Sequence, residues 1–132
     1  MGDVPPPFDA LWFQLLIGFV VGITLGSFIT MLSYRLPRKL SIVLPPSSCP
    51  QCRAPLKVRD LVPVFSWLIT GGKCSQCGAK IGRRYLLIEL ITGIMSAIAF
   101  GVIGFRWELA VVLIFIVTLV TFLTICFEKK QK

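Results

Sequence analysis

Histidine is absent from this chain, and acidic residues are few. None of the 132 residues is a histidine, and only six are Asp or Glu. Without an imidazole the chain cannot build a serine–histidine or a cysteine–histidine catalytic pair. Two carboxylates that share a proton could still activate a water molecule. The acids nearest the basic parts of the chain are Asp60, Glu89 and Glu128, and their spacing favours no such pair.

Charge is absent from two long stretches. No charged residue lies between Asp9 and Arg35, and none lies between Glu108 and Glu128. As helices, both stretches are long enough to cross the roughly 30 Å hydrocarbon layer of a bilayer. A third segment, 85–105, is apolar except for Glu89, one turn inside its leading end. With 55% apolar residues, we predict an all-α membrane protein with three transmembrane helices, at 10–34, 85–105 and 109–127.

A basic N-terminal region is also missing. A secretory signal peptide begins with positive charge, whereas this chain begins with Asp3 and the prolines 5–7. A myristoylation signal has Ser or Thr at its sixth position, and Pro6 is found there. We therefore expect the first apolar segment to remain as a helix.

The positive charges that are present lie on one side of the predicted topology. Ten of the fourteen Lys and Arg residues lie between Arg35 and Arg84, three lie in the segment 129–132, and Arg106 alone lies between the second and third helices. Short loops rich in Lys and Arg remain in the cytosol. We therefore expect an external tail at 1–9, a cytosolic loop domain at 35–84, an external turn at 106–108 and a cytosolic tail at 128–132.

Two CxxC pairs lie in the basic loop. Cys49 and Cys52 are followed, after twenty-one residues, by Cys74 and Cys77. Each two-residue spacer lets a tight turn aim both sulfurs at one point, and four thiolates suit a tetrahedral zinc ion. The cytosol keeps such thiols reduced. We predict a structural zinc site, which has no open position for an activated water.

The loop is too small to build a hydrophobic core of its own, so a bound metal is expected to stabilise it in place of a core. Six prolines between positions 37 and 63 argue against long helices there. Gly78 follows Cys77, where glycine tolerates the bend beneath the sulfurs. Arg53 stands at the equivalent place after Cys52, which weakens the expected symmetry of the two turns.

Glycines recur every four residues in the first helix, at Gly18, Gly22 and Gly26. Such a face lets another helix approach closely. The partner could be a second copy or another protein, but we favour packing within the chain. The second helix offers a patch of small residues for it: Gly93, Ser96 and Ala97.

Several short motifs over residues 20–95 resemble the N-terminal half of the prepilin peptidases. They are Gly26-Ser27-Phe28, Tyr34-Arg35-Leu36-Pro37, Ser41-Ile42-Val43, Pro45-Pro46-Ser47, the CxxC pairs, Asp60-Leu61-Val62-Pro63-Val64, Ser66-Trp67-Leu68, Gly72-Lys73, Arg84-Tyr85 and Glu89-Leu90-Ile91-Thr92-Gly93.

The resemblance implies a multi-pass protein of the bacterial inner membrane. Members of the family are aspartic proteases that cut type IV prepilins and type II secretion pseudopilins, then N-methylate the product with S-adenosylmethionine. It implies a cytosolic tetracysteine loop, and it links Gly72 and Lys73 to the methylation step. Glu89 is either a functional acid within the membrane or a partner of Arg83 or Arg84.

The family's catalytic aspartates lie downstream of this region, the first near the cytosolic end of a helix like 109–127. Here that end runs from Leu123 to Glu128, and no aspartate follows Asp60. The expected function is therefore the zinc-bearing, substrate-docking and methyl-transferring part of a prepilin peptidase system that lacks the aspartate half. The chain would be a fragment, a split subunit or a relative that has lost cleavage.

Other functions stay open. A non-catalytic, zinc-stabilised inner-membrane adaptor could present the basic loop to pilus or secretion proteins, or to anionic lipid. A thiol–disulfide carrier would need a low-pKa cysteine, which the sequence does not indicate. Nucleic acid is not expected as a partner, because Phe65, Trp67 and Tyr85 suit a membrane interface better than base stacking. The expected partners are a prepilin or pseudopilin, a separate aspartic peptidase half and membrane lipid.

Overall fold

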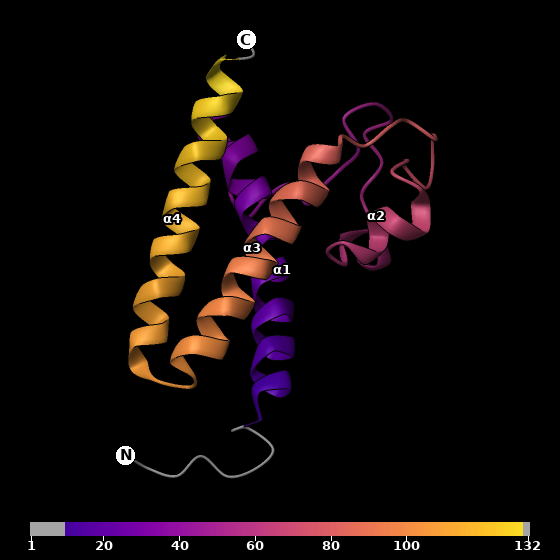
Figure 1. The fold of residues 1–132 in the computed structure, drawn as a ribbon. Helices are drawn as coiled ribbons and strands as arrows, with labels where there is room; N and C mark the ends of the chain where they lie inside the picture. Colours follow the sequence, from indigo (N-terminus) through magenta and orange to yellow (C-terminus); the bar gives the residue numbers. More distant parts are fainter. Residues whose placement is uncertain (1–9, 131–132) are drawn as a thin grey trace.

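The computed structural model describes residues 10–130, which form three long helices and a loop domain (Figure 1). The long helices are α1 (Leu11–Arg35), α3 (Arg83–Ile103) and α4 (Trp107–Lys130). Between α1 and α3 lie two 3₁₀ turns, η1 (Leu36–Arg38) and η2 (Val58–Leu61), and the short helix α2 (Phe65–Thr70). The described residues contain no strand, only two isolated bridges. The expected tail at 1–9 and the last two residues of the segment 128–132 lie outside the described part.

The all-α prediction with three membrane-spanning helices is confirmed. All three long helices are long and apolar enough to cross a bilayer. Many of their large apolar side chains face outward, including Val102, Ile114 and Phe115. A helix satisfies its own backbone hydrogen bonds, so lipid is a suitable environment for such a surface. Figure 1 shows the loop domain and the end of α4 at one end of the bundle, with the α3–α4 turn at the other.

The glycine face of α1 packs against α3, as the sequence indicated. A Cβ atom built on Gly22 would lie 2.6 Å from the Cα of Gly93, which real structures do not allow. Gly18 and Gly26 meet α3 in the same way, with 2.8 and 2.7 Å to the Cα atoms of Ala97 and Glu89. Small residues thus let the two backbones touch, as in close helix pairs within membranes.

The helix α4 packs more loosely. A small apolar cluster joins it to α3, made of Ala99, Phe100, Leu109 and Ile116. At the α3–α4 turn, Gly104 adopts a positive φ of 70°, and Arg106 binds Glu108 at 2.8 Å. Only a small part of the most apolar stretch of α4 is buried, so most of its surface remains open to lipid or to further helices.

Candidate metal centre

The two cysteine pairs sit in turns that share one hydrogen-bond pattern. In the first turn, Cys49 N–H donates to the carbonyl of Ala54 at 3.1 Å, and Arg53 N–H donates to the carbonyl of Cys49 at 2.9 Å. In the second, Cys74 N–H donates to Ala79 at 2.8 Å, and Gly78 N–H donates to Cys74 at 3.0 Å. Both turns therefore direct their cysteines with the same backbone geometry.

The symmetry extends to the residue after each pair. Arg53 has φ 57° and Gly78 has φ 71°, so both occupy the left-handed region. The expectation that Arg53 weakens the symmetry is wrong, because the arginine adopts the conformation that glycine adopts in the second turn. An isolated antiparallel bridge closes each turn, Ser48 with Pro55 and Lys73 with Lys80.

The four sulfurs converge. The Sγ atoms of Cys49, Cys52, Cys74 and Cys77 all lie within 4.8 Å of one another. Those of Cys49 and Cys77 are 3.8 Å apart. Four sulfurs at about 2.3 Å from a central ion in a regular tetrahedron are separated by about 3.8 Å. The four cysteines are thus positioned to bind one metal ion, with Cys49 and Cys74 buried and Cys52 and Cys77 exposed.

The surroundings of the cluster shift the pKa values of two of its thiols in opposite directions. The backbone N–H groups of Cys52 and Gln51 lower the pKa of Cys49 to about 6. For Cys77, the N–H of Ala79 lowers the pKa, but desolvation and the neighbouring cysteines together raise it to about 11. The first thiolate therefore forms readily, while the last proton stays until a cation offsets the charge. The fifth cysteine, Cys126, lies on α4, and its side chain is exposed on the surface of the helical bundle.

Asp60 connects η2 to the second cysteine turn. Its Oδ2 atom accepts a hydrogen bond from Lys57 N–H at 3.1 Å and another from the Ser75 hydroxyl at 3.2 Å. Ser75 is the first spacer residue between Cys74 and Cys77. The carboxylate thus caps the 3₁₀ turn and also fixes the second metal-binding turn against it.

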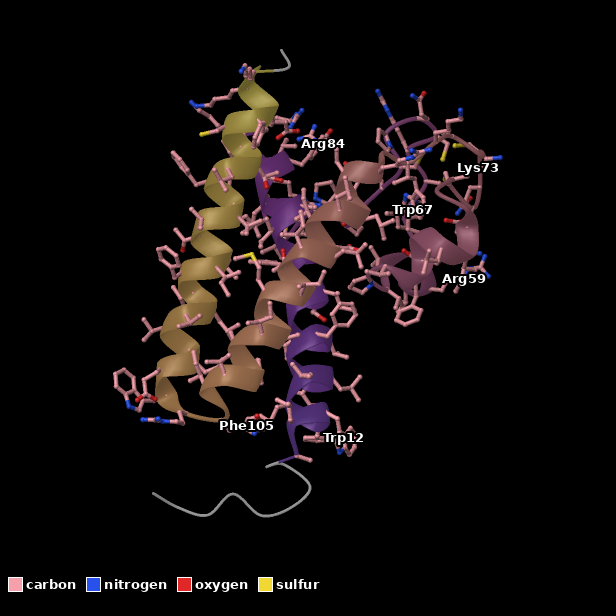
Figure 2. The ribbon with its side chains drawn as sticks, in the orientation of Figure 1. Trp12, Arg59, Trp67, Lys73, Arg84 and Phe105 are labelled. Atoms are coloured by element: carbon pink, nitrogen blue, oxygen red, sulfur yellow. The ribbon has the colours of Figure 1, made fainter. Side chains whose placement is uncertain are left out.

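The indole ring of Trp67 leaves no room for a side chain at Gly72. A Cβ atom on Gly72 would lie 2.8 Å from the indole ring, and the φ of 70° is one that side chains rarely adopt. Its backbone joins α2 to the segment after the second turn, since Gly72 N–H donates to Trp67 and Ile81 N–H donates to Gly72. Lys73, which together with Gly72 was expected from the resemblance to bear on methylation, is exposed and directly precedes Cys74 (Figure 2).

Glu89 connects the helical bundle to the loop domain. Its residue surface is only 8% exposed, and Oε2 accepts a 2.6 Å hydrogen bond from Val64 N–H. Val64 holds a φ of 62°, which is strained for a β-branched residue. The sequence offered a functional acid or an ion pair with Arg83 or Arg84. It gave no signal for this contact, because the two residues lie 25 positions apart in different local structures.

A cavity of about 230 Å³ opens where α1, α3 and α4 meet at the loop end of the bundle. Tyr34, Arg84 and Glu128 contribute to its walls. Glu128 lies 3.6 Å from the guanidinium of Arg38, which stacks over the Tyr34 ring at 4.0 Å. The cavity is separate from the four cysteines, none of which lines it.

The comparisons with known proteins agree with this geometry. The profile described as "Bacterial Peptidase A24 N-terminal domain" matches residues 20–103, which include all four clustered cysteines. The chain belongs to this family. The match begins within α1 and ends with α3, so the peptidase A24 N-terminal domain here comprises Gly22 and Gly26 of the glycine face, the complete loop domain and α3.

Curated relatives are named "Prepilin leader peptidase/N-methyltransferase". The protein of Bacillus subtilis is 41% identical over 107 residues, which are 81% of this chain and 43% of the relative. The Myxococcus xanthus protein is 37% identical over 102 residues, which cover 77% of this chain and 30% of the relative. The Pseudomonas aeruginosa protein is 31% identical over 123 residues, which cover 76% of this chain and 42% of the relative. The chain thus spans less than half of these peptidase A24 relatives, and no solved structure matches it.

Proposed function

We propose that this chain supplies the zinc-bearing, substrate-docking part of a prepilin peptidase system for type IV pili or type II secretion. The observation that carries the proposal is the match of residues 20–103 to the peptidase A24 N-terminal domain, with four sulfurs converging inside it. The catalytic aspartates would come from a second part, either further along a longer polypeptide or in a separate chain.

The metal in this proposal is zinc, with a structural role. Four thiolates are soft ligands that favour zinc in a closed tetrahedral site, and a closed site leaves no place for a reacting water. Cys49 and Cys52 hold one side of the ion and Cys74 and Cys77 the other. The ion would therefore fix the two turns, and through Asp60 the turn η2, in one arrangement.

The proposed location is the bacterial inner membrane, with the N-terminus outside and the zinc loop and C-terminus in the cytosol. The distribution of basic residues supports this orientation, since ten of the fourteen lie in the segment 35–84. A cytosolic loop would face the reducing side and keep its thiols available for zinc.

The cleavage proposal is testable with a chimera. Residues 1–107 of this chain would replace the corresponding part of the Bacillus subtilis relative, expressed in cells that lack their own prepilin peptidase. We expect the chimera to cleave prepilin, and a Cys49→Ser/Cys74→Ser chimera to lose cleavage. A Val43→Ser chimera, changed at an exposed loop residue outside the cysteine turns, should retain cleavage. A membrane-inserted, zinc-loaded chimera that leaves prepilin intact would refute the docking role. Cleavage by the present chain alone would refute the need for a second part.

Methyl transfer is a separate part of the proposal. S-adenosylmethionine would donate the methyl group to the amino terminus of an already cleaved pilin, and Lys73 is the residue of this chain proposed to assist. Gly72 would contribute by holding Trp67 and the second turn in place. The assay follows labelled methyl transfer by the chimera to a cleaved pilin peptide. Lys80 faces Lys73 across the same bridge, so Lys80→Ala is the matched control for Lys73→Ala. Equal activity of the two variants would remove Lys73 from the step.

A further inference from the structure

An uncharged and outward-facing segment lies in the middle of the otherwise basic loop domain. No charged residue occurs between Asp60 and Lys73. Within this run, Phe65, Leu68 and Ile69 are 57%, 59% and 83% exposed. Leu61 and Val62 add further exposed apolar surface on the approach to α2. A run of this length is too short to span a membrane but suits an interfacial segment.

The contact with Glu89 sets the depth of this segment along the bundle. Glu89 is six residues beyond Arg83, the first residue of α3. At about 1.5 Å per residue, it lies roughly 9 Å along the helix from that end. Because Val64 N–H binds its carboxylate at 2.6 Å, the start of α2 lies at the same level. Figure 1 accordingly shows α2 beside the first turns of α3 and not beyond its end.

The spanning helices expose apolar side chains at the same level. Leu87 lies two residues before Glu89 on α3 and is 54% exposed. Phe28 lies two residues after Gly26, which packs against Glu89, and is also exposed. Residues two positions apart point to nearly opposite sides of a helix, so both side chains face away from the α1–α3 contact. In a bilayer the outward surfaces of α1 and α3 at this level contact lipid, and the exposed apolar side chains of α2 lie at that same level.

Basic residues border the uncharged run at both ends. Lys57 and Arg59 precede it and Lys73 follows it. The side chain of Arg59 is 72% exposed, so its guanidinium can extend toward the headgroups while its stem lies along apolar surface. Figure 2 shows Lys73 toward the loop end of the bundle and Arg59 on the outer side of α2. This pattern of an apolar centre with cationic edges is typical of segments that lie in a lipid interface.

We infer that the segment from Leu61 to Ile69 inserts into the lipid leaflet on the loop side of the membrane, with Phe65, Leu68 and Ile69 facing the acyl chains. The loop domain is then attached to the bilayer at a point between its two metal-binding turns. The inference depends on the three helices crossing a membrane and on the Val64–Glu89 contact, and it is independent of prepilin processing.

Photo-crosslinking in cell membranes tests this placement. The full chain would carry p-benzoylphenylalanine in place of Ile69, and in a second variant in place of Phe65, where one aromatic ring replaces another. Phe115 in the middle of α4 is the lipid-facing positive control. Val43 is the control within the loop domain, since it is 79% exposed and lies in a loop that Arg35 binds at Ser41 and Pro45.

We expect phospholipid adducts at Ile69 and Phe65 in yields similar to those at Phe115, and no such adduct at Val43. The metal content of each variant shows that its cysteine turns are intact. Two results would overturn the inference in metal-loaded protein. One is the absence of phospholipid at both α2 positions while Phe115 is labelled, and the other is a protein adduct in its place, which would identify the segment as a protein interface.

Discussion

Gly22 of α1 lies so close to Gly93 of α3 that a side chain on either residue would meet the opposite helix. A Cβ atom on Gly22 would also lie 2.6 Å from the Cβ of Ser96 and from the carbonyl oxygen of Thr92. Backbone atoms cannot move aside as a flexible side chain can. The α1–α3 pair therefore depends on the absence of side chains at this crossing.

Replacing Gly22 with leucine is expected to separate α1 from α3. Overpacking of a tight contact costs about 1–3 kcal/mol, and contact with backbone places this site at the upper end of the range. The measurement is the unfolding free energy of the purified chain in mixed micelles, titrated with a denaturing detergent. Thr24→Leu adds similar bulk to the exposed side of the same helix and should change stability little. Equal stability of the two variants would contradict the close packing of α1 against α3 at Gly22.

Removal of the metal is expected to unfold the cysteine turns without removing the helices from the membrane. A metal-folded loop depends on its ligands, whereas spanning helices depend on lipid. The purified chain should contain about one zinc, and a strong chelator should make residues 49–80 sensitive to protease. Cys49→Ser should behave as the chelated protein does, while Cys126→Ser should keep both zinc and protease resistance. A loop equally resistant with and without metal would argue against a structural ion.

The left-handed conformations of Arg53 and Gly78 predict opposite effects on metal affinity. The left-handed backbone conformation costs a non-glycine residue roughly 1 kcal/mol or more. Because the turns fold together with metal binding, this cost lowers the affinity for the metal. Arg53→Gly should therefore bind zinc about fivefold more tightly, and Gly78→Ala about fivefold more weakly. Competition with a chromophoric chelator measures both constants. Arg53→Lys controls for the charge and should match the parent chain; a large loss in Arg53→Gly would show that the guanidinium itself matters.

Removing the carboxylate of Glu89 is expected to release α2 from the bundle. Glu89→Ala leaves the Val64 N–H without its acceptor, at a cost of about 1–3 kcal/mol for a buried donor. Hydrogen exchange at Val64 and Phe65 should accelerate, while the metal content stays constant. Glu89→Gln retains an amide oxygen as acceptor and should exchange more slowly than Glu89→Ala. If exchange at Val64 is the same in both variants and the parent, the contact does not hold the segment.

The sequence predicted what depends on local pattern. Two charge-free stretches and a third that holds a single acid, Glu89, are long enough to specify the three helices, and the CxxC spacing is enough to specify a cluster of four sulfurs. The glycine repeat also identified both faces of the α1–α3 contact, because small residues occur on each at helical spacing. Six prolines likewise indicated short elements, and α2 has only six residues.

The features that the sequence did not reveal depend on the backbone or on distant contacts. Arginine has no preference for positive φ, so nothing in the residue type marked Arg53 as the equivalent of Gly78. Glu89 looked like an acid near a helix end with arginines close by. Its hydrogen bond to Val64 arises only when the loop folds back along α3, and no periodicity encodes that return.

The hydrogen bond from Val64 to Glu89 also affects the mobility of the loop domain. The chain between Cys52 and Cys74 leaves the metal-binding turns, touches α3 at Glu89 and comes back. An ion bound to the four sulfurs would join the two ends of this excursion and close it into a ring. The ring is connected to α3 through the Val64–Glu89 hydrogen bond and through the chain that enters the helix at Arg83. Displacing the ring from the side of α3 would therefore break that hydrogen bond, so detachment of α2 and displacement of the metal-bearing turns should occur in one event.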